Sequence, residues 1–140
     1  MSTPRPPHRG YPTWVGRGTA RGEHGAVGSV QLVVVMPLLM GFFLAGMQAA
    51  LYYYGRTAAI SIAQTGATAA AADGGSVAHC RQAAAELQAR IGDALTDVTI
   101  TCQRSGTKAT STVTGLTLSV FPGWRSEVVQ QAEAPVEEVT

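Results

Sequence analysis

Residues 25–55 contain no charged side chain, and this stretch constrains the fold more than any other feature of the chain. A helix rises about 1.5 Å per residue, so about 20 apolar residues cross a hydrocarbon layer of roughly 30 Å. Residues 30–54 reach that length. The tyrosines at 52–54 lie at the end of the run, where an aromatic belt meets lipid headgroups. We therefore predict a membrane-spanning helix that is retained as an anchor.

Two other interpretations of this stretch remain open. A cleavable signal peptide has about 7–15 apolar residues followed by a small-residue cleavage site. The run here is longer and ends in bulky tyrosines, and an Ala-x-Ala match such as residues 67–69 comes well after it. A buried helix of a soluble protein is the third interpretation. The length and the tyrosine end favour the anchor.

The charges on the two sides of the apolar run are unequal. Residues 1–24 carry four arginines and one glutamate, whereas residues 55–140 carry six basic and eight acidic groups. Basic residues before a span predict a cytoplasmic N-terminus and an exported C-terminal part. Residues 1–24 are also rich in Pro and Gly, which predicts disorder. Their Arg-Gly pairs near Tyr11 and Trp14 would suit nucleic acid, but a topological role beside a span is favoured, so we expect no nucleic-acid partner.

Several residues within the run have predicted roles in the helix. Pro37 removes one backbone donor and predicts a kink, which membrane helices tolerate. Gln31 lies at the cytoplasmic edge, where it is either interfacial or hydrogen-bonded to another helix. Small residues four apart allow a second helix to approach closely. They are Gly41, Ala45, Gly46, Ala49 and Ala50.

The rest of the chain predicts a small α+β domain over residues 73–140. The alanine-rich residues 56–72 continue the first helix as a stalk, so that residues 25–72 form one transmembrane and stalk segment. Apolar residues at steps of three and four predict a second helix over residues 77–95, with Ser76 as its N-cap.

Alternation of period two then predicts strands over residues 97–104 and 108–120. The apolar parity shifts between Val113 and Leu116, which predicts a bulge at Gly115. Residues 126–136 favour a third strand, with a helix over 126–134 as the alternative. The predicted fold is therefore a long N-terminal transmembrane helix continuing into a stalk, followed by a helix packed on a short antiparallel β-meander.

The two cysteines, Cys80 and Cys102, fall on the core faces predicted for the second helix and the first strand. A disulfide between them would contribute about 3 kcal/mol by closing a loop; two unpaired core thiols are the alternative. His8, His24 and His79 show no metal-ligand spacing with the cysteines. No nucleophile, phosphate-loop, dinucleotide or zinc-protease motif occurs. We therefore predict no metal, no cofactor and no enzymatic activity.

The stretch RGEHGAVGSVQLVVVMPLLMGFFLAGMQAALYYYGRTAAISIAQTGATAAA, residues 21–71, resembles the N-terminal module of TadE-like proteins. These are pseudopilins of the tight-adherence, Flp-type pilus system. The family has a basic Gly-containing leader, a Glu, a proline six residues later, a long Ala-rich helix and a β-rich exported domain. Pro37 matches the family proline, and Gln31 occupies the position where the family usually has Glu. The resemblance also implies an actinobacterial source.

The resemblance implies a structural role, that of a minor pilin or pilus-assembly protein in the cytoplasmic membrane. Its implied partners are the bilayer, other pilin-like or tight-adherence secretion proteins, and a prepilin peptidase that cuts between Gly25 and Ala26. Gln31 would hydrogen-bond to a neighbouring subunit's new N-terminal amine without neutralising it. The alternatives are an anchored extracytoplasmic binding module unrelated to pili and a secreted protein whose leader is removed.

Overall fold

The computed structural model describes residue 10 and residues 24–137. The elements are α1 (His24–Ala71), α2 (Val77–Ile91), β1 (Leu95–Arg104), β2 (Lys108–Thr117) and β3 (Glu127–Pro135). The strands form one antiparallel sheet in the order β1-β2-β3. The predicted α+β class, a long first helix and a second helix with a β-meander, is confirmed. The interpretation of residues 1–24 as disordered lies, apart from Gly10 and His24, outside the described residues.

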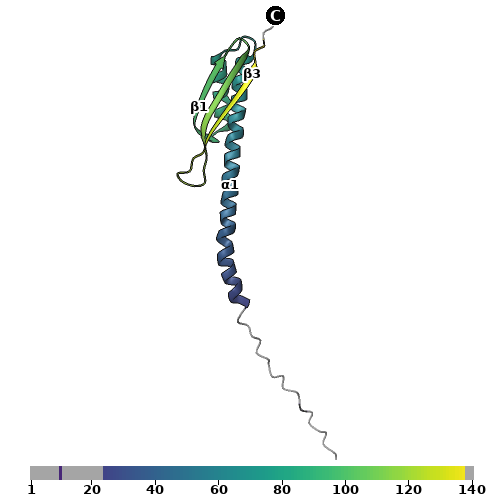
Figure 1. Ribbon diagram of the computed structural model, residues 1–140, viewed down its shortest axis with the longest axis vertical. Helices are drawn as coiled ribbons and strands as arrows, with labels where there is room; N and C mark the ends of the chain where they lie inside the picture. The colour runs from purple at the N-terminus through teal and green to yellow at the C-terminus, as the bar shows by residue number, and fades with distance from the viewer. Residues whose placement is uncertain (1–9, 11–23, 138–140) are drawn as a thin grey trace, which may run out of the picture. The chain divides into compact units, whose positions relative to one another are not determined.

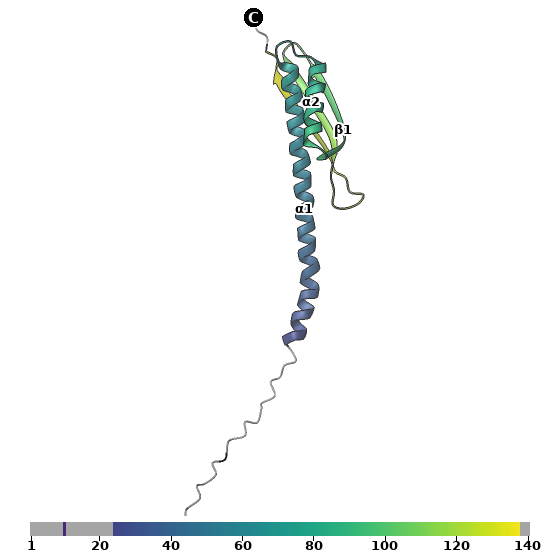
Figure 2. The same ribbon diagram turned by 180° about the vertical axis from the view of Figure 1, so that it is seen from behind.

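The chain divides into two compact units, Met1–Pro37 and Leu38–Thr140. The second unit contains α2, the sheet and α1 from Leu38 onward. Within this unit, the C-terminal part of α1 and α2 lie on the same face of the sheet, as the two opposite views show (Figures 1 and 2). An antiparallel sheet of this kind has one face in the core and one in solvent.

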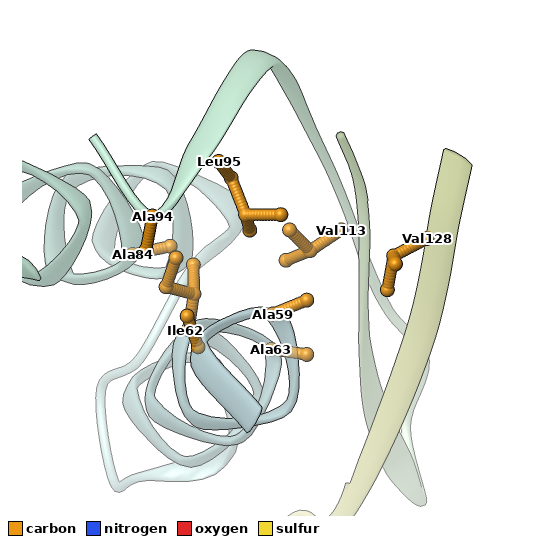
Figure 3. Packing of buried hydrophobic residues seen from close by; sticks show 9 residues of the cluster. Ala59, Ile62, Ala63, Ala84, Ala94, Leu95, Val113 and Val128 are labelled. Atoms are coloured by element: carbon orange, nitrogen blue, oxygen red, sulfur yellow. The ribbon is translucent and has the colours of Figure 1, made fainter. Parts of the chain in front are cut away.

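The C-terminal part of α1 supplies much of the core. Ala59 and Ala63 point from α1 toward the strands that carry Val113 and Val128, and Ile62 points toward Ala84 of α2 (Figure 3). Ala84 of α2, Ala94, Leu95 and Val128 complete the cluster together with Ala58. Alanine both favours helix and lets a helix approach a sheet closely. The residues that the sequence identifies as a stalk are therefore also the central helix of the domain core.

Helix α2 begins as predicted and ends earlier than predicted. The Ser76 side chain caps its N-terminus by accepting a hydrogen bond from the backbone N–H three residues on, at 3.2 Å. The predicted end at Leu95 is wrong, because α2 stops at Ile91. Gly92 follows with φ 72°, and its N–H donates to the Gln88 carbonyl at 3.2 Å. A positive φ is open to glycine and rarely to other residues, so the helix ends here and Leu95 becomes the buried first residue of β1.

The bulge lies in β1 and not in β2, which corrects the prediction at Gly115. Thr96 pairs with Leu116 and Thr99 pairs with Thr114, so two β1 residues are opposite Gly115 alone. The alternation along β2 is unbroken, and every second residue is buried. These are Ala109, Ser111, Val113, Gly115 and Thr117. Leu116 lies on the outer, solvated face of β2. Because it is apolar, it made the alternation of apolar residues seem to change faces between Val113 and Leu116.

Strand β3 resolves the choice left open for residues 126–136. Glu127–Pro135 form a strand, and the helical alternative is wrong. Strand β2 ends at Thr117 and not at residue 120. The Thr117 N–H donates to the Ser126 carbonyl at 2.9 Å, and residues 118–126 form the β2–β3 loop. In Figure 1 this loop extends beyond the end of the sheet.

Candidate functional site

The apolar run predicted from the sequence is an uncovered surface of α1. Most of its large side chains between Val30 and Tyr54 are exposed, from 42% at Val35 to 71% at Phe42. In the part of the chain that the structure describes, α1 is the one helix long and apolar enough to cross a membrane. Leaving apolar surface in water costs about 25 cal/mol per Å². This surface therefore needs lipid or another protein around it.

The predicted processing residues and the predicted kink all lie in α1. Gly25 and Ala26 fall in its first turn, because the helix begins at His24. Gln31 is exposed on the same helix. Pro37 lies inside α1, which continues on both sides of it. Cleavage between Gly25 and Ala26 and a bend at Pro37 stay predictions.

The small residues predicted for helix packing lie on different faces of α1. All of them are exposed: Gly41, Ala45, Gly46, Ala49 and Ala50. At 100° per residue, Gly46 and Ala50 are about 160° around the helix from Gln48. Ala45 and Ala49 are closer to Gln48, at about 60° and about 100°. A methyl group added at Gly46 would meet no atom within 4 Å. The Gly46 face is therefore bare, and the Ala45 face adjoins the β2–β3 loop.

Gln48 holds the β2–β3 loop against α1. Its Oε1 accepts a hydrogen bond from the Val120 backbone N–H at 2.9 Å and another from Ser119 Oγ at 3.1 Å. The Ser119 hydroxyl also accepts from the Phe121 N–H at 3.1 Å, which tightens the loop beside the helix. Gln48 is the polar side chain within the outer part of the apolar run, and here its amide oxygen is satisfied inside its own chain.

A cavity of about 370 Å³ lies between α1 and this loop. Its walls are Ala45, Gln48, Ala49, Tyr52, Tyr53, Phe121, Trp124 and Ser126. The rings of Phe121 and Trp124 lie 6.4 Å apart, and those of Tyr52 and Tyr53 lie 5.8 Å apart at edge-to-face orientation. Aromatic rings thus face the cavity from both the loop and the helix.

Cys80 of α2 and Cys102 of β1 form a disulfide, with their Cα atoms 6.3 Å apart. Both residues are buried, in a cluster with Ala70, Ala71 and Ala109. The bond ties the second helix to an edge strand of the sheet. Its position in the core agrees with the faces on which the sequence places both cysteines.

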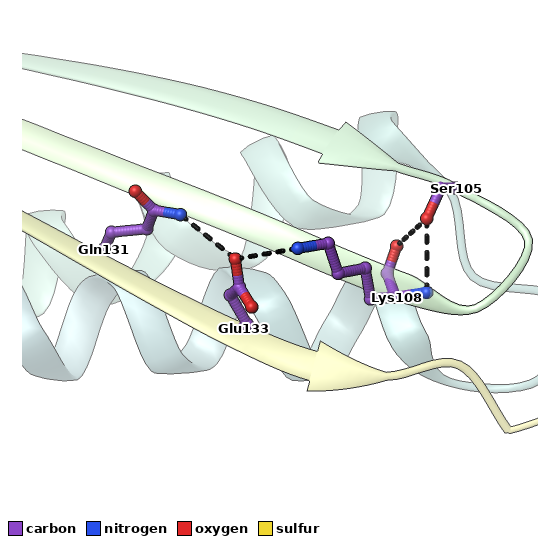
Figure 4. Close-up of polar contacts among 4 residues, drawn as sticks. All are labelled: Ser105, Lys108, Gln131 and Glu133. Carbon is purple, nitrogen blue, oxygen red and sulfur yellow. Dashed lines mark hydrogen bonds and ion pairs between the residues drawn. The ribbon is translucent and has the colours of Figure 1, made fainter.

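The side-chain contacts around Glu133 are exposed to solvent. On its outer face, Lys108 Nζ donates to Glu133 Oε1 at 3.1 Å, and Gln131 donates to the same carboxylate (Figure 4). The Lys108 and Glu133 side chains are 57% and 48% exposed, and exposed ion pairs contribute little to stability. Among residue 10 and residues 24–137, no group of three His, Cys, Asp or Glu side chains could hold a metal ion.

Sequence reasoning missed Gln48 and the aromatic loop. Both left a signal. Gln48 is an amide within the apolar run, and such a group needs a partner where water is scarce. Residues 118–124, LSVFPGW, form an uncharged segment with two aromatic rings that ends up as an exposed loop. What the sequence could not supply is that the two meet, because Val120 and Gln48 are 72 residues apart.

The comparisons with known proteins identify one segment. A search of curated proteins and a search of solved structures each found no match. Residues 26–68 match the family described as TadE-like protein. The matched segment lies entirely inside α1, so α2 and the sheet fall outside it. The resemblance drawn from the sequence is confirmed over this range, and the chain carries a TadE-like segment at residues 26–68.

Proposed function

We propose that the chain is a membrane-anchored TadE-like minor pilin or pilus-assembly protein of the tight-adherence system. One observation carries the proposal: the uncovered, uncharged surface of α1 lies within the TadE-like segment. A helix that exposes this much apolar surface is stable only in lipid or against other apolar helices. The protein would act through helix packing and protein contacts and not through catalysis.

The proposed location is the cytoplasmic membrane, crossed once. The basic residues 1–24 would remain in the cytoplasm, residues 25–72 would form the span and its continuation, and residues 73–140 would be extracytoplasmic. The charge difference across the span supports this orientation. The disulfide between Cys80 and Cys102 supports it independently, because disulfides persist in oxidising compartments outside the cytoplasm.

The bare face of α1 at Gly46 and Ala50 is the proposed contact for a pilin-like partner helix. Small residues four apart let two helix backbones come close, so packing contacts accumulate along the seam. The β2–β3 loop adjoins the other side of α1, near Ala45 and Ala49. A partner helix on the Gly46 face would therefore not compete with the loop.

Processing between Gly25 and Ala26 by a prepilin peptidase is part of the proposal. Intact mass and N-terminal sequencing of the protein isolated from membranes test it. A mature start at Ala26 supports pilin-type processing. A start at Met1 or Ser2 indicates a plain anchor. A start beyond Tyr54 would indicate a secreted protein, and the cut would have to precede Ala58, because the core needs Ala58, Ala59 and Ile62.

Site-specific cross-linking tests the assembly role. Gly46→Cys adds a thiol on the bare face, and Ala49→Cys is the matched control beside the loop. With a membrane-permeant reagent that carries a maleimide for the new thiol and a photoreactive diazirine for any neighbouring residue, we expect Gly46→Cys to cross-link to a pilin-like protein and Ala49→Cys not to do so. Deletion of the gene should abolish tight-adherence pili. Pili that assemble normally without the protein would instead favour an anchored binding module.

A further inference from the structure

The β2–β3 loop, residues 118–126, has the composition of a membrane contact. Its segment 118–124 carries no charge. Leu118 is 40% exposed, Phe121 39% and Trp124 62%, although each is large and apolar. Tryptophan and tyrosine concentrate at the boundary between hydrocarbon and headgroups, where an apolar ring and a polar N–H or O–H are both satisfied.

The loop lies beside the outer end of the apolar run. Ala45, Ala49 and Tyr52 of α1 form one wall of the cavity, and Phe121 and Trp124 form the other. The α1 residues that line this wall come before Arg56 in the sequence, and Arg56 is the first charged residue after the apolar run. Whatever surrounds the apolar side chains of α1 at this level also reaches Phe121 and Trp124. If α1 crosses a bilayer, that surrounding is lipid.

Gln48 fixes the loop at this level. Its Oε1 accepts from the Val120 N–H and from the Ser119 hydroxyl. An amide left unpaired in hydrocarbon costs several kcal/mol, roughly 4–8 on the cyclohexane scale. The contact therefore pairs the amide oxygen of Gln48 with two donors of the loop. It would be favoured near the hydrocarbon boundary, where less water competes for these groups than in bulk solvent.

The one charged residue of the loop also suits a lipid headgroup. Arg125 follows Trp124 directly, and its side chain is 64% exposed. Its guanidinium lies 3.8 Å from Asp97, a pair weak enough to be shared with other anions. A guanidinium next to an interfacial tryptophan meets the phosphate layer of a bilayer.

We propose that the β2–β3 loop is a second membrane contact, in which Phe121 and Trp124 lie in the interfacial layer of the outer leaflet and lipid chains fill the cavity against α1. The proposal rests on the membrane anchoring of the proposed function. Its consequence is orientation: a helix alone leaves the exported domain free to rotate and tilt, whereas a second contact fixes which face of the sheet meets pilus components.

Tryptophan fluorescence of the full chain in phospholipid vesicles tests this contact. The chain has two tryptophans, Trp14 and Trp124, so Trp14→Phe makes Trp124 the reporter. We expect blue-shifted emission, stronger quenching by lipids brominated near the headgroups than near the chain ends, and little quenching by iodide. Adding Gln48→Leu should red-shift the emission and weaken the lipid quenching, while Gln64→Leu, on the exposed part of the same helix, should change neither.

Two reporters in the Trp14→Phe/Trp124→Phe background separate this proposal from the anchor itself. Phe43→Trp probes the span, and Thr101→Trp probes the exposed face of β1. The loop contact is overturned if Trp124 behaves like the Thr101→Trp reporter while the Phe43→Trp reporter is quenched by deep bromines. If the Phe43→Trp reporter also escapes lipid quenching, the proposed membrane anchoring by α1 is overturned together with the loop contact. Shielding of Trp124 from both quenchers would mean that protein covers the loop, which also overturns the proposal.

Discussion

Gly66 of α1 and Ser111 of β2 are in direct contact, with no room for a side chain between them. A methyl group added to Gly66 would lie 2.7 Å from Ser111 Oγ and 3.0 Å from Cys80 Sγ. Ser111 is fully buried, and Cys80 is held by its disulfide, so neither neighbour can move away freely. Helix and strand approach this closely because residue 66 has no Cβ.

Gly66→Ala is therefore expected to lower the free energy of unfolding by about 1–3 kcal/mol, the usual cost of overpacking a core. Intrinsic helix propensity acts the other way by about 1 kcal/mol, so a loss would show that packing dominates. The measurement is urea unfolding of the full chain in detergent micelles, followed by near-ultraviolet circular dichroism. Gly46→Ala is the matched control in the same helix, because its added methyl group meets no atom within 4 Å. An equal loss in both variants would contradict the packing argument.

Ser111→Ala should relieve part of the Gly66→Ala penalty. The serine hydroxyl is the atom nearest to the added methyl group, and within the described residues it has no hydrogen-bond partner. Removing it therefore costs little in wild type and opens space in the variant. A double-mutant cycle measures the coupling, and we expect the double variant to be more stable than the sum of the two single changes predicts. Strict additivity would show that the contact is not the source of the penalty.

Loss of the Cys80–Cys102 disulfide is expected to lower the free energy of unfolding by about 3 kcal/mol, from the chain entropy of the loop that it closes. The two cysteines are separated by 22 residues and lie in the core. Cys80→Ala/Cys102→Ala can be compared with wild type in the same unfolding experiment. Reductant should lower the stability of wild type and leave the double variant unchanged. Equal stability of wild type and the double variant without reductant would refute a stabilising role.

Asp97 in the β1 bulge has φ 52°, a left-handed conformation that aspartate tolerates and β-branched residues do not. Asp97→Val is expected to cost about 1–3 kcal/mol, whereas Asp97→Gly should be neutral or slightly stabilising. Both changes remove the exposed pair with Arg125, so Arg125→Gln serves as the control for that pair. If the valine and glycine variants were equally stable, backbone conformation would not explain the bulge.

Helices, strands and core faces could be predicted from the sequence wherever a residue pattern is compatible with a single structure. The uncharged run, the period-two strands and the core faces of Cys80 and Cys102 all belong to this kind, because they depend on neighbours along the chain. The bulge could not be placed, because it depends on the register between β1 and β2. Leu116, an apolar residue on the outer face, made the parity of one strand misleading.

The alanine-rich second half of α1 shows a different limit. Its sequence suits a solvated stalk and a tightly packed core helix equally, because small side chains lower the apolar signal that marks burial. The close approach becomes understandable only from the opposite side, where the small residue Ser111 of β2 lies against Gly66. The pairing of Gln48 with the loop was hidden for a related reason: it joins segments about half the chain apart.

Gln48→Leu is expected to release the β2–β3 loop while leaving the core intact. The change removes the acceptor of two hydrogen bonds, each worth about 1 kcal/mol. Local opening of residues 118–126 should therefore become about 30-fold more frequent, with the Val120 amide most affected. Hydrogen–deuterium exchange of the full chain in micelles measures this directly. Gln64→Leu is the matched control on the same helix, and Gln48→Glu, which keeps an acceptor oxygen, should restore slow exchange. Uniformly faster exchange across the sheet would instead mean that Gln48 supports the whole domain and not the loop alone.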